Sequence, residues 1–120
     1  RFWTAVMDDY YRGDYDIAVA GFEQYVRAFP TSTKAVDAQV NIGHSHMIQG
    51  KYDKAIEAYD NAIRTYPPGE AIADAYFKKG EAHLNLKQTD RAREAWQFVI
   101  KTYPDSNAAL QAKQRLLSVQ

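Results

Sequence analysis

Two histidines separated by one residue, His44 and His46, are the side chains of this sequence that most suggest chemistry, because a His-x-His pair could bind a metal ion. On an α-helix, however, side chains two residues apart diverge by about 200° and do not reach one ion, unlike the pairs four residues apart in zinc helices. His46 and His83 are 37 residues apart and occupy one repeat position, which favours packing. The sequence therefore predicts no metal site and no cofactor.

The carboxylates give no better case for catalysis. No base or nucleophile lies close in the sequence to the carboxylates of Asp8, Asp9, Asp14, Asp16 and Glu57. The chain also has no glycine-rich phosphate loop. Charged residues in such an arrangement are typical of solvated helix faces. We expect a protein that is not an enzyme.

Composition narrows the choice of partners. The 120-residue chain, about one domain long, has fifteen basic and fifteen acidic residues, so there is no basic surplus to neutralise phosphates or anionic lipid. Tyrosines 10, 11 and 15 could stack on bases, but no stripe of Lys or Arg accompanies them. No apolar run approaches the roughly 20 residues of a membrane span. Nucleic acid and direct membrane insertion are thus disfavoured. The lack of cysteine fits an oxidising compartment but does not prove one.

A repeat of 37 residues organises the chain. Three series keep this step, namely Ala18, Ala55 and Ala92; Phe22, Tyr59 and Trp96; and Pro30, Pro67 and Pro104. A period of about 20 to 50 residues indicates a solenoid, in which each unit buries its apolar face by stacking on the next. This favours recognition rather than chemistry.

Each repeat reads as a helical hairpin, so the predicted fold is all-α. The helix boundaries follow from the apolar spacing, from Gly50 and the three prolines at helix ends, and from Ser32 (or Thr31) and Ser106 as N-caps. These signals predict helices over 1–12, 15–28, 33–49, 52–65, 70–86, 89–102 and 106–118. We expect one domain over 1–120, with repeats of approximately 1–32, 33–69 and 70–105. The helix over 106–118 would cap the third hairpin through Ala109, Leu110, Ala112, Leu116 and Leu117.

These fixed positions resemble the tetratricopeptide repeat (TPR) family, whose small crossing residues correspond to Gly43, Gly80 and the three alanines. The resemblance implies a right-handed superhelix of three hairpins plus a capping helix. Within the family, the 37-residue unit and the strings at 14–22, 73–80 and 102–106 resemble the C-terminal domain of YbgF/CpoB-type periplasmic proteins of the Tol–Pal system. Outer-membrane assembly lipoproteins with such repeats share the Tyr-Pro ending.

In this family the first helix of each hairpin lines a concave groove. The register then predicts a partner-binding groove formed by Trp3, Met7, Tyr10, Val40, Asn41, His44, Phe77, Lys78 and Glu81, with Asp37 and Asp74 also facing it. Aromatic, Met and polar side chains together suit a bound peptide or helix. The alternative is that Trp3, Val40 and Phe77 only fill gaps between helices. A clamp for a C-terminal carboxylate is disfavoured, because Asp74 would repel an acidic tail.

The resemblance implies a non-catalytic scaffold of the Gram-negative periplasm. Its implied partners are the TolA-type protein and the peptidoglycan synthase machinery, and its task is to coordinate Tol–Pal outer-membrane constriction with wall synthesis during cell division. The alternative is a TPR module of an outer-membrane protein assembly lipoprotein. The chain begins at Arg1 without a signal peptide, which suggests a processed piece. Any oligomerisation would then involve a region before Arg1.

Overall fold

The computed structural model describes residues 1–119, which form seven α-helices joined by short turns and contain no strand. The helices are α1 (Phe2–Arg12), α2 (Tyr15–Ala28), α3 (Thr33–Ile48), α4 (Tyr52–Thr65), α5 (Glu70–Asn85), α6 (Thr89–Thr102) and α7 (Asn107–Ser118). The predicted all-α class is confirmed, and each predicted helix ends within one residue of the observed one.

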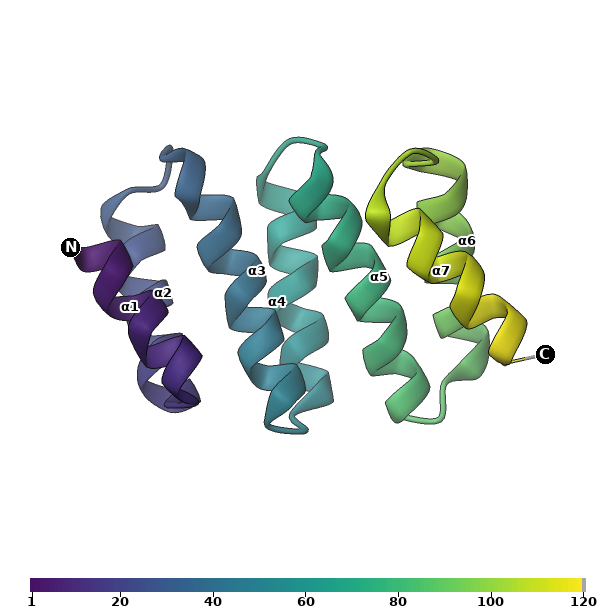
Figure 1. Ribbon diagram of the computed structural model, residues 1–120, viewed down its shortest axis with the longest axis horizontal. Helices are drawn as coiled ribbons and strands as arrows, with labels where there is room; N and C mark the ends of the chain where they lie inside the picture. Colours follow the sequence, from purple (N-terminus) through teal and green to yellow (C-terminus); the bar gives the residue numbers. More distant parts are fainter. Residues whose placement is uncertain (120) are drawn as a thin grey trace.

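The helices are stacked side by side along the long axis of the molecule and form two layers (Figure 1). Helices α1, α3, α5 and α7 make one layer, α2, α4 and α6 make the other, and the two termini lie at opposite ends. The principal extents are 44 × 27 × 20 Å. This stack of antiparallel hairpins is a TPR superhelix. Within residues 1–119, no helix has the length and apolar character to cross a membrane.

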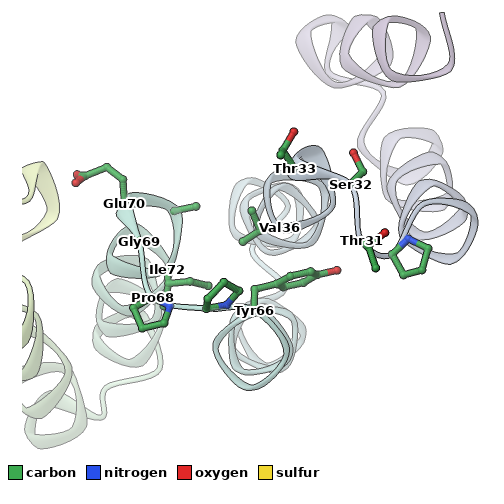
Figure 2. Close-up of a pocket in the computed structure, with 12 residues that line it drawn as sticks. Thr31, Ser32, Thr33, Val36, Tyr66, Pro68, Gly69, Glu70 and Ile72 are labelled. Atoms are coloured by element: carbon green, nitrogen blue, oxygen red, sulfur yellow. The ribbon is translucent and has the colours of Figure 1, made fainter.

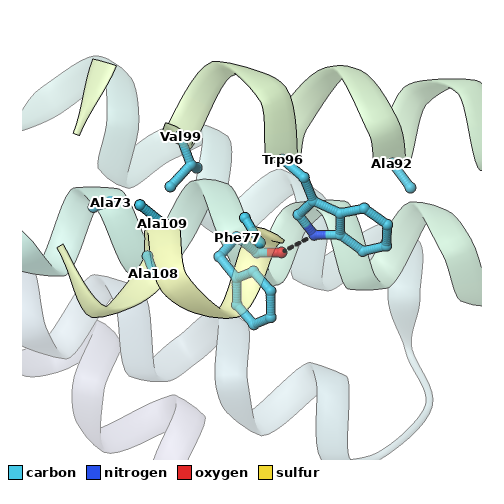
Figure 3. Packing of buried hydrophobic residues seen from close by; sticks show 8 residues of the cluster. Ala73, Phe77, Ala92, Trp96, Val99, Ala108 and Ala109 are labelled. Carbon is cyan, nitrogen blue, oxygen red and sulfur yellow. Dashed lines mark hydrogen bonds between the residues drawn. The ribbon is translucent and has the colours of Figure 1, made fainter. Parts of the chain in front are cut away.

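The series that repeat every 37 residues form the core. Phe22, Tyr59 and Trp96 have no exposed surface, and neither do the three alanines of the repeat. The Trp96 indole Nε1 donates a hydrogen bond of 3.2 Å to the carbonyl oxygen of Phe77, which ties α6 to α5 (Figure 3). The core aromatics therefore fix the crossing of the two helices in each hairpin.

Close helix crossings explain the glycines of α3 and α5. A Cβ atom on Gly43 would overlap the ring of Tyr59, and one on Gly80 would overlap the ring of Trp96. The first hairpin reverses this arrangement, because Val6 stands at the equivalent place on α1 and packs against Gly21 of α2. A Cβ atom on Gly21 would lie 2.9 Å from Val6 Cγ2.

Helix ends follow the sequence signals closely. The Ser32 hydroxyl accepts from the backbone N–H of Lys34, and the Ser106 hydroxyl accepts from that of Ala109, so both serines are N-caps as predicted. Gly13 and Gly50 have left-handed φ angles of 87° and 74°, which glycine adopts without a Cβ penalty. Lys87 fills the same place in the third unit with φ 65°.

Helix α7 packs on α5 and α6 with some of the residues that the sequence suggested, because Ala109 and Ala112 are buried as predicted. Its buried side chains are Ala108, Ala109 and Ala112, which join the cluster around Phe77 and Val99. Leu110 and Leu117 are 59 % and 75 % exposed, so the prediction that they cover the third hairpin is wrong. Leu116 is half-buried against the cluster. Small side chains allow α7 to approach α5 closely, and this places the larger leucines on the outside.

Candidate functional site

A hollow of about 280 Å³ lies between α1, α3 and the start of α5, in the layer of first helices. We call it the open groove. It is lined by Trp3, Met7, Asp37, Val40, Asn41, His44, Ala71 and Asp74. The hollow thus combines an aromatic ring, a thioether, an amide, an imidazole and two carboxylates within one short stretch of surface.

Five of the nine predicted groove residues meet here: Trp3, Met7, Val40, Asn41 and His44. The Asn41 amide Nδ2 lies 3.7 Å from the Met7 sulfur and so joins α3 to α1. Trp3 is half-buried and packs at 5.7 Å and 5.1 Å, centroid to centroid, on Phe22 and Tyr25. Only part of its ring is therefore available to a partner.

His44 connects the core to the open groove through both of its ring nitrogens. Nδ1 lies 2.7 Å from the hydroxyl oxygen of Tyr59, and Nε2 lies 3.1 Å from Oδ2 of Asp74. In the tautomer with the proton on Nε2, the ring accepts from the Tyr59 hydroxyl at Nδ1 and donates to the carboxylate at Nε2. The chain of three side chains therefore holds the Asp74 carboxylate at the groove wall.

Tyr10 does not line the open groove. Its ring packs within the first hairpin, 5.9 Å from the Phe22 ring and 5.8 Å from that of Tyr15, centroid to centroid. Tyr10 is half-buried. Its prediction as a contact residue is not supported by this placement, because its ring serves the packing of α1 on α2.

Phe77 is not a groove residue but a core residue, so this prediction is wrong. Its side chain is 1 % exposed and lies among the cluster of α5, α6 and α7 residues seen in Figure 3. The Trp96 ring is 6.4 Å away between centroids, and the guanidinium of Arg115 lies 6.0 Å from the Phe77 centroid. A partner cannot reach this ring while α7 is in place.

Lys78 and Glu81 lie beyond the hollow, on the part of α5 that α7 approaches. Glu81 accepts from the Arg115 guanidinium at 2.8 Å from Nε, and Lys78 Nζ lies 3.5 Å from the other carboxylate oxygen of Glu81. The carboxylate is thus already paired within the chain. In the layer of α1, α3, α5 and α7, which we call the inner layer, the open groove lies in the N-terminal half.

Two carboxylates, Asp37 and Asp74, line the open groove, and two phenols lie near it. Burial is the largest cause of the raised pKa of Tyr59, and the Asp74 carboxylate raises it further. Burial also raises the pKa of Tyr10, with smaller contributions from Tyr15, Tyr11 and Asp74. Both phenols keep their protons at neutral pH.

The chain matches the family described as "YfiO: Outer membrane lipoprotein" over residues 1–120. The chain belongs to the YfiO family. No curated protein matches its sequence significantly. Among solved structures it is similar to the crystal structure of MamA, at 20 % identity and a TM-score of 0.44, covering 81 % of this chain and 73 % of that one. The closer resemblance to YbgF/CpoB-type proteins stays a prediction.

This YfiO-family chain has a second and larger hollow, of about 480 Å³, which the sequence reasoning missed (Figure 2). It lies between the turn before α3 and the turn before α5, with Val36, Tyr66 and Ile72 among its walls. The available signal was Pro67-Pro68-Gly69, because the turn before α5 has two prolines and a glycine in place of a capping serine. The two hollows are neighbours and share the lining residue Ala71.

Proposed function

We propose that the chain is a non-catalytic interaction module of the bacterial cell envelope, and that the open groove binds a segment of a partner protein. The observation that carries this proposal is the hollow itself, in which Trp3, Met7 and Asn41 stand side by side on α1 and α3. Aromatic and Met side chains are enriched at the centres of protein interfaces, and Met adapts its shape to an irregular partner.

Two side chains at the groove that could act as acids or bases, His44 and Tyr59, are engaged in structure. Both nitrogens of His44 have partners, and Tyr59, the hydroxyl beside it, has no exposed surface. A nucleophile or proton donor must reach its substrate within hydrogen-bond distance. This arrangement supports binding rather than catalysis.

Membership of a family of outer membrane lipoproteins supports a location in the envelope, on its periplasmic side. Two finer roles are open to test. One is coordination of Tol–Pal constriction with wall synthesis, with a TolA-type protein and peptidoglycan synthases as partners. The other is a TPR module of an outer-membrane protein assembly lipoprotein.

A pair of double variants tests the groove. Met7→Ala with Asn41→Ala removes two touching groove side chains, and Gln24→Ala with Glu57→Ala removes two exposed side chains of α2 and α4 as a matched control. Calorimetric titration with the TolA-type protein, and separately with proteins of the outer-membrane assembly machinery, measures affinity. We expect at least about tenfold weaker binding for the groove variant and unchanged binding for the control.

Circular dichroism of both variants checks that helical content is unchanged. The partner that binds the unmodified chain decides between the two roles. If the Gln24/Glu57 variant loses affinity and the Met7/Asn41 variant keeps it, the partner contacts the outer layer and the groove proposal is wrong. If neither class of partner binds, both finer roles are wrong.

A further inference from the structure

The two formal charges that line the open groove are both negative. Asp37 on α3 and Asp74 on α5 occupy one repeat position, 37 residues apart, and both border the hollow. The whole chain has fifteen acidic and fifteen basic residues, so this negative lining is local and does not follow from the overall charge.

Among residues 1–119, neither carboxylate forms a salt bridge with Lys or Arg. Elsewhere on the surface Asp60 lies 2.7 Å from Lys79 Nζ, Asp16 lies 3.6 Å from Lys51 Nζ, and Glu81 binds Arg115. In the part of the chain that the structure describes, the one ion-pair contact of Asp74 is to His44, and Asp37 forms none. The groove therefore holds two carboxylates whose charge is not balanced by Lys or Arg.

The aromatic wall of the groove also receives a cation. Lys34 Nζ lies 5.3 Å from the centroid of the Trp3 ring, which is within the distance at which an ammonium group is attracted by an aromatic face. Lys34 contacts this ring and not the nearby Asp37. The face of Trp3 that attracts a cation is thus already occupied by Lys34, and the preference for a basic partner rests on the two carboxylates.

We propose that the open groove selects a peptide segment that presents a Lys or Arg side chain to Asp37 and Asp74 beside an apolar side chain that packs on the half-buried Met7. This inference rests on the proposed function, because it names the chemistry of the segment bound there. Complementary charge across an interface selects the partner and speeds association. His44 acts as a positioning residue, since its Nε2 holds the Asp74 carboxylate.

Selection from a random library of 12-residue peptides on the immobilised chain tests the proposal, followed by fluorescence polarisation of the selected peptides. We expect enrichment of Lys or Arg next to apolar residues. Asp37→Asn with Asp74→Asn should weaken these peptides at least about fivefold. The matched control, Glu57→Gln with Glu94→Gln, removes the same charge from exposed sites on α4 and α6 and should leave affinity within about twofold. Raising the salt concentration should weaken binding to the unmodified chain.

A sign reversal sharpens the test, because Asp37→Lys with Asp74→Lys should select acidic peptides from the same library. The proposal is overturned if the peptides selected on the unmodified chain are neutral or acidic, if the Asn variant binds them equally well, or if no peptide is enriched. A peptide that is lost on Met7→Ala with Asn41→Ala but kept on Asp37→Asn with Asp74→Asn leaves the groove proposal intact and refutes only the charge preference. Peptides kept on both variants refute the proposed function itself.

Discussion

One position of the repeat, which recurs every 37 residues, is occupied by Trp3, Val40 and Phe77. The next helix of the inner layer is α3 for Trp3, α5 for Val40 and α7 for Phe77. Trp3 and Val40 border the open groove between α1 and α3. Phe77 is covered by α7 and is 1 % exposed. Val40 borders the groove but is itself only 4 % exposed and belongs to the core. The same repeat position therefore keeps a partly exposed side chain in the first unit and is core in the second and third units.

A second repeat position, occupied by more polar side chains, also changes its role along the chain. Met7 and His44 line the open groove, and their counterpart Glu81 is bound to Arg115 of α7. Helix α7 thus closes the C-terminal half of the inner layer with both an apolar and an ionic contact. In a solenoid, the role of a repeat position depends on whether another helix covers it.

The largest effect that separates the two halves should come from Phe77→Ala. Removal of a buried Phe side chain leaves a cavity and typically costs about 3–5 kcal/mol in the free energy of unfolding. Asn41→Ala, in the open half, should cost less than about 1 kcal/mol because its amide is only partly buried. Urea denaturation monitored by circular dichroism measures both. Equal losses for the two variants would show that Phe77 is not covered.

A smaller effect should distinguish the two faces of α7. Ala109 has no exposed surface, so Ala109→Leu should destabilise the chain by about 1–3 kcal/mol through overpacking against α5 and α6. Leu110→Ser and Leu117→Ser are the controls, and each should lie within about 0.5 kcal/mol of the unmodified chain because both side chains are exposed. Thermal melts of the three variants rank them. A larger loss for either leucine would reverse the orientation assigned to α7.

The helices and most of the core were predictable from the sequence because they depend on features that all three repeats share. The 37-residue step located the alanines, the core aromatics and the prolines, and the glycine and serine signals located the helix ends. Reasoning from shared features missed the contacts that occur in one repeat only. It gave no counterpart of Gly43 in the first hairpin, where Gly21 on the other helix makes room for Val6.

The errors at the site have a similar cause. Periodicity assigns Phe77 to the inner layer but does not say that α7 returns over it. Hydrophobicity favours Leu110 and Leu117 over alanines as packing residues, yet a close helix approach requires the small side chains of Ala108, Ala109 and Ala112. The hollow beside Tyr66 depends on the exact path of the turn before α5, which no period describes.

The smallest expected effect is a gain in stability from Lys87→Gly in the third unit. Lys87 has φ 65°, in the left-handed region where an L side chain costs roughly 1–2 kcal/mol, and glycines occupy the equivalent places 13 and 50. Glycine also loses more conformational freedom on folding, which offsets about 0.4–1 kcal/mol of the gain. The net increase in the free energy of unfolding should be about 0.5–1 kcal/mol by urea denaturation. Gly50→Lys is the mirror control: a Cβ atom there meets nothing within 4 Å, so a loss of similar size would come from the backbone alone. If both Lys87→Gly and Gly50→Lys lower the free energy of unfolding, the turn between α5 and α6 depends on the Lys87 side chain. The third unit would then differ from the other two at this turn as well as at the residues that α7 covers.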